Sequence, residues 1–460
     1  MKIRSLLLGS VAAAGLSTGG AFAADLGVLT SLDVCDALGL SGLTISSDTN
    51  CLQITGEVKY KFTWGDYDDG IFIYTGAGIL GLEVEGDGDQ DWQSRFDAWV
   101  KFVATADSDF GPAKAVLKLK EVNNRVGEEG LGTFIGSSDT GGVILDEAYV
   151  SIGDTTVIMA GKKGSIMKKG DDEPLNWLGL FNSEKVDVGV NWGPFEDSSG
   201  LADGGHVIQV VSDLGNGFSI GAGLEKLDGD NVLGGAGTAV GVLSYAGEGI
   251  SAHITGAAAG VLDGEVEAWG VHAGFSGTFD NFKVVLAGAY GATGDQAYLN
   301  VVGPPAFDAR NREYWNILAS ASATFDMFTL AASFEAVDTD IYEDDGPDYG
   351  AGVSLSAAVT DGVILNVGAR WYQQNMILDG ADAYQIAASV AAAVTESITV
   401  TGELGYINDG DDEDVIYGAA KLAWAPGGGY VSSIKGTVSS GNDDAEVGYK
   451  IESEFLKTFE

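Results

Sequence analysis

Side chains that could carry out catalysis are scarce in this sequence and widely separated. The three histidines are His206, His253 and His272, and the two cysteines are Cys35 and Cys51. Nucleophilic catalysis needs a serine or cysteine, a histidine and an acid held in one constellation. Because the histidines are distant from one another in the chain, we expect neither an enzyme nor a catalytic metal centre, and no cofactor.

Two groups of carboxylates have spacings that could bind Ca²⁺, an ion that prefers oxygen ligands. They are Asp87, Asp89 and Asp91, and Asp409, Asp411, Asp412 and Asp414. Such clusters are more often solvated loops. Calcium binding is therefore the weaker interpretation of both groups.

The overall charge limits the partners of the chain. There are 67 acidic and 24 basic side chains, which gives a formal net charge of −43. That charge alone would suit a disordered chain, but 45% hydrophobic and 10% aromatic residues indicate a folded one. Because no stripe rich in Lys and Arg is present, we exclude nucleic acid as a partner.

The first residues have the pattern of a secretory signal peptide. Lys2 and Arg4 precede an apolar run of about 11 residues, and Ala21-Phe22-Ala23 forms a small-x-small cleavage site. A membrane anchor is the weaker alternative, since a spanning helix needs about 20 apolar residues. We therefore predict a signal peptide over residues 1–23 and export of the rest.

Export has a consequence for the two cysteines. In an oxidising compartment, Cys35 and Cys51 are expected to form one disulfide rather than a reactive pair. This bond would attach a periplasmic N-terminal segment, residues 24–50, to the start of the first strand. Residues 51–460 form the main domain.

The elements of this main domain are predicted to be strands. Residues 53–64, 95–104 and 113–120 each alternate between apolar and polar side chains, which is the period of a strand with one wet face. Nine short turns, such as residues 213–217 and 247–249, alternate along the chain with longer acidic connections. This alternation predicts an all-β antiparallel up-and-down barrel with its short turns at one end.

A membrane barrel is favoured over a soluble all-β protein with interior aromatics. Strands of about ten residues, the signal peptide and aromatics near the strand ends all suit a barrel that crosses the outer membrane. A barrel in lipid must be closed, because open edges would leave backbone groups unpaired. Counting hairpins predicts up to twenty strands.

The polar faces of the first three strands carry much of the scarce positive charge. The inward-facing basic residues are expected to be Lys59, Lys61, Arg95, Lys101, Lys114, Lys118 and Lys120. In a barrel of this size, side chains cannot fill the lumen, so the residues that line it control what passes. We call these residues, with Lys162 discussed below, the basic wall.

A long acidic segment, residues 164–205, is the candidate constriction. Its carboxylates include Asp171, Asp172, Glu173, Glu184 and Asp187. Loops of this length are usually functional or disordered. We predict that it folds into the lumen opposite the basic wall, where low-dielectric walls focus the field. The alternative is an external loop that covers the surface.

Several segments resemble the outer-membrane porins of alphaproteobacteria, of the rhizobial and Brucella type. They are MKIRSLLLGS at residues 1–10, VCDALG at 34–39, CLQITGEV at 51–58 and DEAYVSIG at 146–153. The resemblance implies a homotrimeric general-diffusion channel, usually of sixteen strands, with the third long loop inside. It also places Lys162 in the basic wall, where the family has an arginine. The greater length and the Glu460 that follows Phe459 are departures from the family.

Together these observations predict an outer-membrane porin. Small hydrophilic solutes and ions would diffuse through it passively with a mild preference for cations, and outer-membrane lipid would surround it. Two alternatives remain open. One is a solute-selective channel in which Trp99, Trp177, Trp192 or Tyr149 guides the solute. The other is an occluded structural or adhesive barrel.

Overall fold

The computed structural model describes most of the chain between Asp33 and Glu460. The described residues are 33–66, 90–128, 132–135, 142–167, 204–228, 236–294, 311–340, 346–374, 381–408, 414–440 and 448–460. The predicted signal peptide lies outside them. Within the described part of the chain, no helix has the length and hydropathy of a transmembrane helix.

Strands dominate the described residues, with one short helix, α1 (Asp33–Ala37), before them. The strands are β1 (Thr44–Ser46), β2 (Asn50–Asp66), β3 (Gln90–Ala106), β4 (Ala113–Glu128), β5 (Gly132–Ile135), β6 (Ile144–Ile152), β7 (Thr156–Lys163), β8 (Gly205–Gly215), β9 (Phe218–Glu225), β10 (Thr238–Gly247), β11 (Ile250–Ala259), β12 (Ala268–Phe279), β13 (Phe282–Thr293), β14 (Glu313–Phe325), β15 (Phe328–Thr339), β16 (Asp348–Thr360), β17 (Val363–Gln374), β18 (Ala381–Ala393), β19 (Ile398–Asn408), β20 (Asp414–Gly427), β21 (Tyr430–Ser440) and β22 (Gly448–Phe459).

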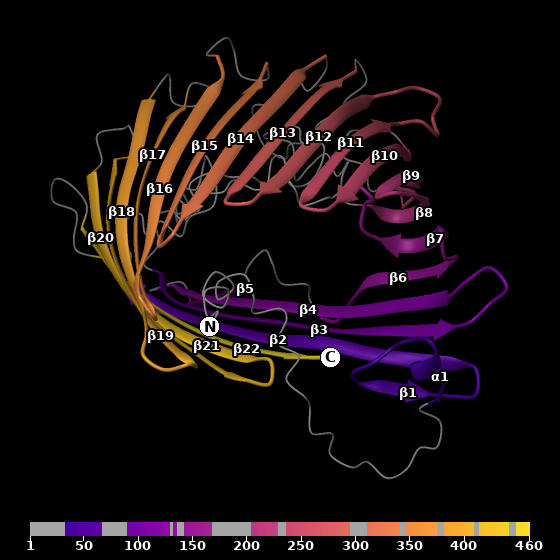
Figure 1. Cartoon of the computed structure of the whole chain (residues 1–460), viewed down its shortest axis with the longest axis horizontal. Helices are drawn as coiled ribbons and strands as arrows, with labels where there is room; N and C mark the ends of the chain where they lie inside the picture. Colours follow the sequence, from indigo (N-terminus) through magenta and orange to yellow (C-terminus); the bar gives the residue numbers. More distant parts are fainter. Residues whose placement is uncertain are drawn as a thin grey trace.

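Twenty of these strands form one closed antiparallel barrel (Figure 1). The last strand, β22, pairs with the first barrel strand, β2, from Gly56 opposite Phe459 to Asp66 opposite Tyr449. Two short strands are additions to the wall, since β1 pairs with β2 and β5 pairs with β4. The hairpin count of twenty is thus confirmed, and the sixteen strands implied by the resemblance are corrected. No open edge remains in the barrel wall.

The connections follow the predicted alternation. Nine tight turns join β3 to β4, β6 to β7, and then every second pair up to β20 and β21. Asn216, Asp280 and Asp326 take the positive φ that such turns need, with values of 53°, 50° and 52°. Because successive strands are antiparallel, all nine turns lie at one rim of the barrel and the longer connections lie at the other.

The outward face of the barrel is apolar, and its rims carry aromatic side chains. Val58, Tyr60 and Trp64 of β2 are among the large exposed apolar residues. Phe282 and Phe325 contact each other at the short-turn rim, with ring centroids 5.8 Å apart. Trp64 and Tyr449 do so toward the other rim at 5.4 Å. Two aromatic girdles around an apolar band are typical of a barrel in a membrane.

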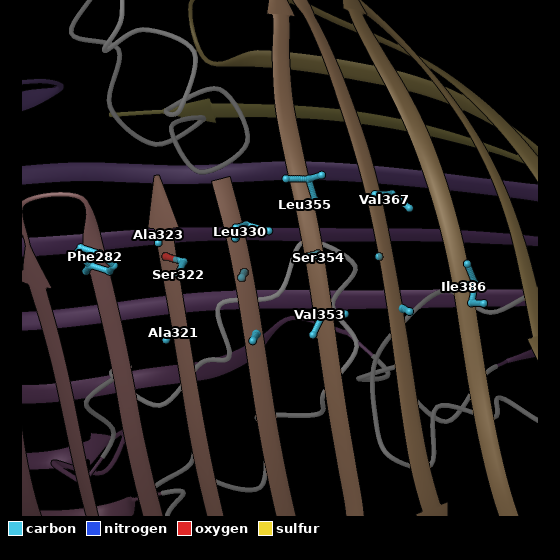
Figure 2. A pocket seen from close by; sticks show the side chains of 14 residues that line it. Phe282, Ala321, Ser322, Ala323, Leu330, Val353, Ser354, Leu355, Val367 and Ile386 are labelled. Atoms are coloured by element: carbon cyan, nitrogen blue, oxygen red, sulfur yellow. The ribbon is translucent and has the colours of Figure 1, made fainter. Parts of the chain in front are cut away.

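A shallow apolar hollow interrupts this outward face across β13 to β18 (Figure 2). Its volume is about 520 Å³. Small side chains such as Ala321 and Ala332 form its floor, between larger ones such as Phe282, Leu355 and Ile386. The inward face has the opposite character, because many of its buried side chains are polar. The barrel is therefore apolar outside and polar inside.

Candidate functional site

Strand register places seven of the predicted basic residues on the inward face of β2, β3 and β4. Lys61 lies opposite Arg95, Lys101 opposite Lys118, and Lys114 opposite Thr105, so these side chains share one face. The neighbouring residues Val58 and Tyr60 occupy the outward face. Alternation along each strand then puts Lys59 and Lys120 on the inward face as well.

Most of these basic residues form ion pairs with carboxylates on the wall itself. The pairs are Lys59 with Glu454 (3.2 Å), Lys61 with Glu452 (2.8 Å), Arg95 with Asp97 (3.1 Å), Lys101 with Glu147 (2.8 Å), Lys118 with Asp146 (2.7 Å), and Lys435, also with Glu452 (3.6 Å). The five basic side chains of β2 to β4 in these pairs are 22% to 40% exposed. Sequence analysis missed these wall carboxylates as partners, because only strand register reveals them. The positive charge of the wall is thus largely balanced where it lies.

Two aromatic residues on the inward face hold lysines. The Nζ of Lys118 lies 5.2 Å from the ring centroid of Trp99, and that of Lys163 lies 5.7 Å from that of Tyr149. Both distances suit a cation–π interaction. The other two aromatic candidates, Trp177 and Trp192, lie outside the described residues.

Lys162 is an exception to the prediction for the basic wall. It lies opposite Ala148, which shares the outward face of β6 with the exposed Val150. Its Nζ donates a hydrogen bond to the carbonyl oxygen of Leu145 at 2.8 Å. A shift of one residue along a strand reverses the face, so the next residue, Lys163, is the one that points inward.

The acidic residues of the predicted constriction, Asp171, Asp172, Glu173, Glu184 and Asp187, lie outside the described residues. The segment's first residues, 164–167, are described and lie against the inward face of β8 and β9. There, Gln209 Nε2 donates to the Gly164 carbonyl oxygen at 3.1 Å, and the Ile166 backbone N–H donates to Glu225 Oε1 at 3.2 Å. The long segment therefore leaves β7 toward the lumen.

The calcium candidates are mostly beyond what the structure describes. Asp87, Asp89, Asp409, Asp411 and Asp412 lie outside the described residues, while Asp91 lies in β3 and Asp414 begins β20.

Asp414 is engaged within the wall. Its Oδ1 accepts hydrogen bonds from the Tyr406 hydroxyl and from Asn408 Nδ2. In the described part of the chain, no group of three or more His, Cys, Asp or Glu side chains could hold a metal ion.

Register brings together two histidines that are distant in the sequence. His253 of β11 lies opposite Gly274, and His272 of β12 lies opposite Thr255. Their ring centroids are 4.5 Å apart, and both side chains are buried on the inward face. His253 Nδ1 and the Thr255 hydroxyl form a hydrogen bond of 3.1 Å. The alternation of each strand was the sequence signal that could have predicted a shared face.

The predicted disulfide is present, with a distance of 2.07 Å between the Cys35 and Cys51 sulfur atoms. Cys51 lies opposite Thr105 near the short-turn rim, on the inward face of β2. The bond therefore fixes α1 to the inner side of this rim. Both cysteines are buried.

Comparison with known proteins supports the same kind of molecule. The sequence model of the porin subfamily matches residues 31–431. Curated protein sequences give no match. Among solved structures, the trimer form of OmpT, an outer membrane protein of Vibrio cholerae, shares 11% identity over 90% of this chain and 100% of that chain, with a TM-score of 0.40.

Two further structures are porins by name. A mutant of the Rh. blastica porin shares 13% identity over 89% of this chain and 100% of that chain, with a TM-score of 0.36. The anion-selective porin from Comamonas acidovorans shares 12% over 89% and 100%, with a TM-score of 0.37. Since the subfamily model spans most of the chain, and since the strands close into a barrel of the outer-membrane type, the chain belongs to the porin subfamily.

Proposed function

We propose that this outer-membrane porin is a water-filled channel through which small hydrophilic solutes and ions diffuse passively. One observation carries the proposal: a closed wall of twenty strands has an inward face of charged and polar side chains and an outward face of apolar ones. A lumen of this size holds water unless loops plug it. The family points to a channel rather than to an enzyme.

The water path runs along the basic wall. Charged side chains of β2, β3 and β4 are partly exposed, as given above. Inward-facing residues on the opposite side, such as His272, Asn316 and Glu335, are no more than 1% exposed. Ions therefore meet Lys59, Lys101 and the carboxylates paired with them.

A mild preference for cations is the selectivity that we propose. Two observations support it: acidic residues greatly outnumber basic ones, and the basic wall is balanced by its own carboxylates. Salt screens the charges on external loops, so the preference is mild. The acidic residues between Asp171 and Asp187 add to it if the segment continues into the lumen.

Trimeric assembly and membership of the alphaproteobacterial type belong to the same proposal. The motifs at residues 34–39, 51–58 and 146–153 support the type. The apolar outward face offers surface both for outer-membrane lipid and for neighbouring subunits.

Conductance of the purified protein in a planar bilayer under a salt gradient tests these statements. We expect large ohmic steps, grouped in threes, and a zero-current potential of the sign that favours cations. A potential that favours chloride would overturn the selectivity. Silence of a folded protein would instead favour the occluded structural or adhesive barrel.

A further inference from the structure

Two buried polar side chains face the lumen from adjacent strands. Gln209 lies on β8 and Glu225 at the end of β9, and both are 0% exposed. Gln209 Nε2 donates a hydrogen bond to Glu225 Oε1 at 2.8 Å. A buried carboxylate is costly unless it accepts hydrogen bonds, so this pair needs a structural reason.

Both side chains also hold the start of the long segment that follows β7. Gln209 Nε2 reaches the carbonyl oxygen of Gly164, and Glu225 Oε1 accepts the backbone N–H of Ile166. One carboxylate oxygen thus accepts two N–H groups, and hydrogen bonds to an ionised group are stronger than neutral ones. The ammonium group of Lys163, the last residue of β7, adds an electrostatic attraction to Glu225. We call Gln209 and Glu225 the stem clamp.

Packing beside the stem clamp fits the same role. Met167 is fully buried and Ile166 is 8% exposed. A Cβ on Gly221 would lie 3.1 Å from Ile166 Cδ1, and one on Gly223 would lie 3.1 Å from Gln209 Cγ. Glycine at these two inward positions of β9 leaves room for the stem and for the clamp.

From this geometry we propose that Glu225 and Gln209 are positioning residues for the long segment, residues 164–204. They fix its entry to the wall, and so they set the width of the passage beside the basic wall. The inference rests on the proposed function, because a passage width matters only if the barrel conducts. Neither residue needs to touch a solute.

Accessibility of a single introduced thiol tests the clamp without any need for conduction. Both native cysteines are in the disulfide, so Met167→Cys adds the sole free thiol. We expect this thiol to resist a water-soluble methanethiosulfonate reagent. Adding Glu225→Ala should raise the labelling rate by about tenfold or more, since losing a hydrogen bond to a charged group shifts an equilibrium by that factor.

Matched variants separate the clamp from general damage. Glu403→Ala removes a carboxylate of the opposite wall that accepts a hydrogen bond from the Tyr417 hydroxyl at 2.8 Å, and it should leave labelling slow. Glu225→Gln keeps an acceptor for Ile166 and should also leave it slow. Ser433→Cys, on the partly exposed inward face of β21, shows that the reagent reaches the lumen. If Glu225→Ala does not fold, Gln209→Ala gives the same readout.

Single-channel conductance then tests the effect on width. Glu225→Ala should increase the conductance and the open-channel noise, and it should admit larger sugars in vesicle-swelling assays. Equal labelling with and without Glu225→Ala would overturn the clamp even in a conducting protein. Faster labelling in a barrel that never conducts would support the clamp and refute the proposed function.

Discussion

The ion pairs of the basic wall lead to a prediction about selectivity. The triple substitution of Lys59, Lys101 and Lys118 by Glu places a negative charge beside Glu454, Glu147 and Asp146, where an ion pair stood. Anions lose their attraction to the water path, and cations gain one. The zero-current potential under a salt gradient should therefore shift toward cations, with a permeability ratio raised several-fold.

Lys162→Glu is the matched control for this experiment. It makes the same change of charge on the outward face, two residues from the inward-facing Gly161 and Lys163 pattern, so selectivity should stay as in the wild type. An unchanged potential in the triple variant would show that the basic wall does not line the pore. A shift in the control would show that register was assigned to the wrong face.

At the scale of single elements, the turn between β8 and β9 shows why particular residues were predictable. Gly217 has a φ of 84°, and a Cβ there would lie 2.2 Å from the carbonyl oxygen of Ala246. Gly215 has a similar φ of 79° but open space around it. Gly215→Ala should cost about 1–2 kcal/mol from backbone strain alone. Gly217→Ala should cost more because of the contact, as measured by urea midpoints in lipid vesicles. Equal midpoints would contradict this account.

The N-terminal element depends on the disulfide. Cys35 and Cys51 close a loop of 16 residues in sequence separation, which stabilises such a segment by about 3 kcal/mol. In Cys35→Ser/Cys51→Ser, we expect the amides of Leu38 and Leu40 in α1 to exchange with solvent faster, on the order of a hundredfold for that free energy. Hydrogen exchange with mass spectrometry measures this.

Dithiothreitol provides the internal control for the same experiment. It should reproduce the change in the wild type and have no effect on the double variant. The β2–β22 ladder from Gly56 to Asp66 does not involve the bond, so its protection should persist. Loss of protection along that ladder would mean that the disulfide maintains barrel closure instead.

Sequence alternation predicted the strands, the turns and the face of seven basic residues, because these depend on local periods. It could not predict pairing partners. Glu454 meets Lys59 only when β22 closes on β2, and Glu147 meets Lys101 across β4. Lys162 was misplaced because a resemblance supplied its role without the register of β7. The stem clamp was missed because Gln209 and Glu225 have no period or motif, and they matter only through contacts with residues 164–167.

At the scale of the whole molecule, strand number follows from counting hairpins rather than from resemblance. A barrel of twenty strands is wider than one of sixteen, since diameter grows with strand number. Side chains of the wall alone therefore cannot narrow the lumen to the size of a small solute. This geometry makes the anchoring of the long segment by Glu225 important for the function of the entire barrel.

The contrast between the two faces of the barrel gives the last prediction. Val353 of β16 is 58% exposed on the outward face, beside the apolar hollow of Figure 2. Val353→Arg should destabilise the barrel in lipid vesicles by about 2–4 kcal/mol, the cost of a cation near the middle of a bilayer. Ser433→Arg, which places the same side chain on the inward face opposite Glu454, should cost close to nothing. Urea unfolding in vesicles measures both. In a soluble all-β protein the outward face would be wet and Val353→Arg nearly neutral, so that result would refute a membrane barrel.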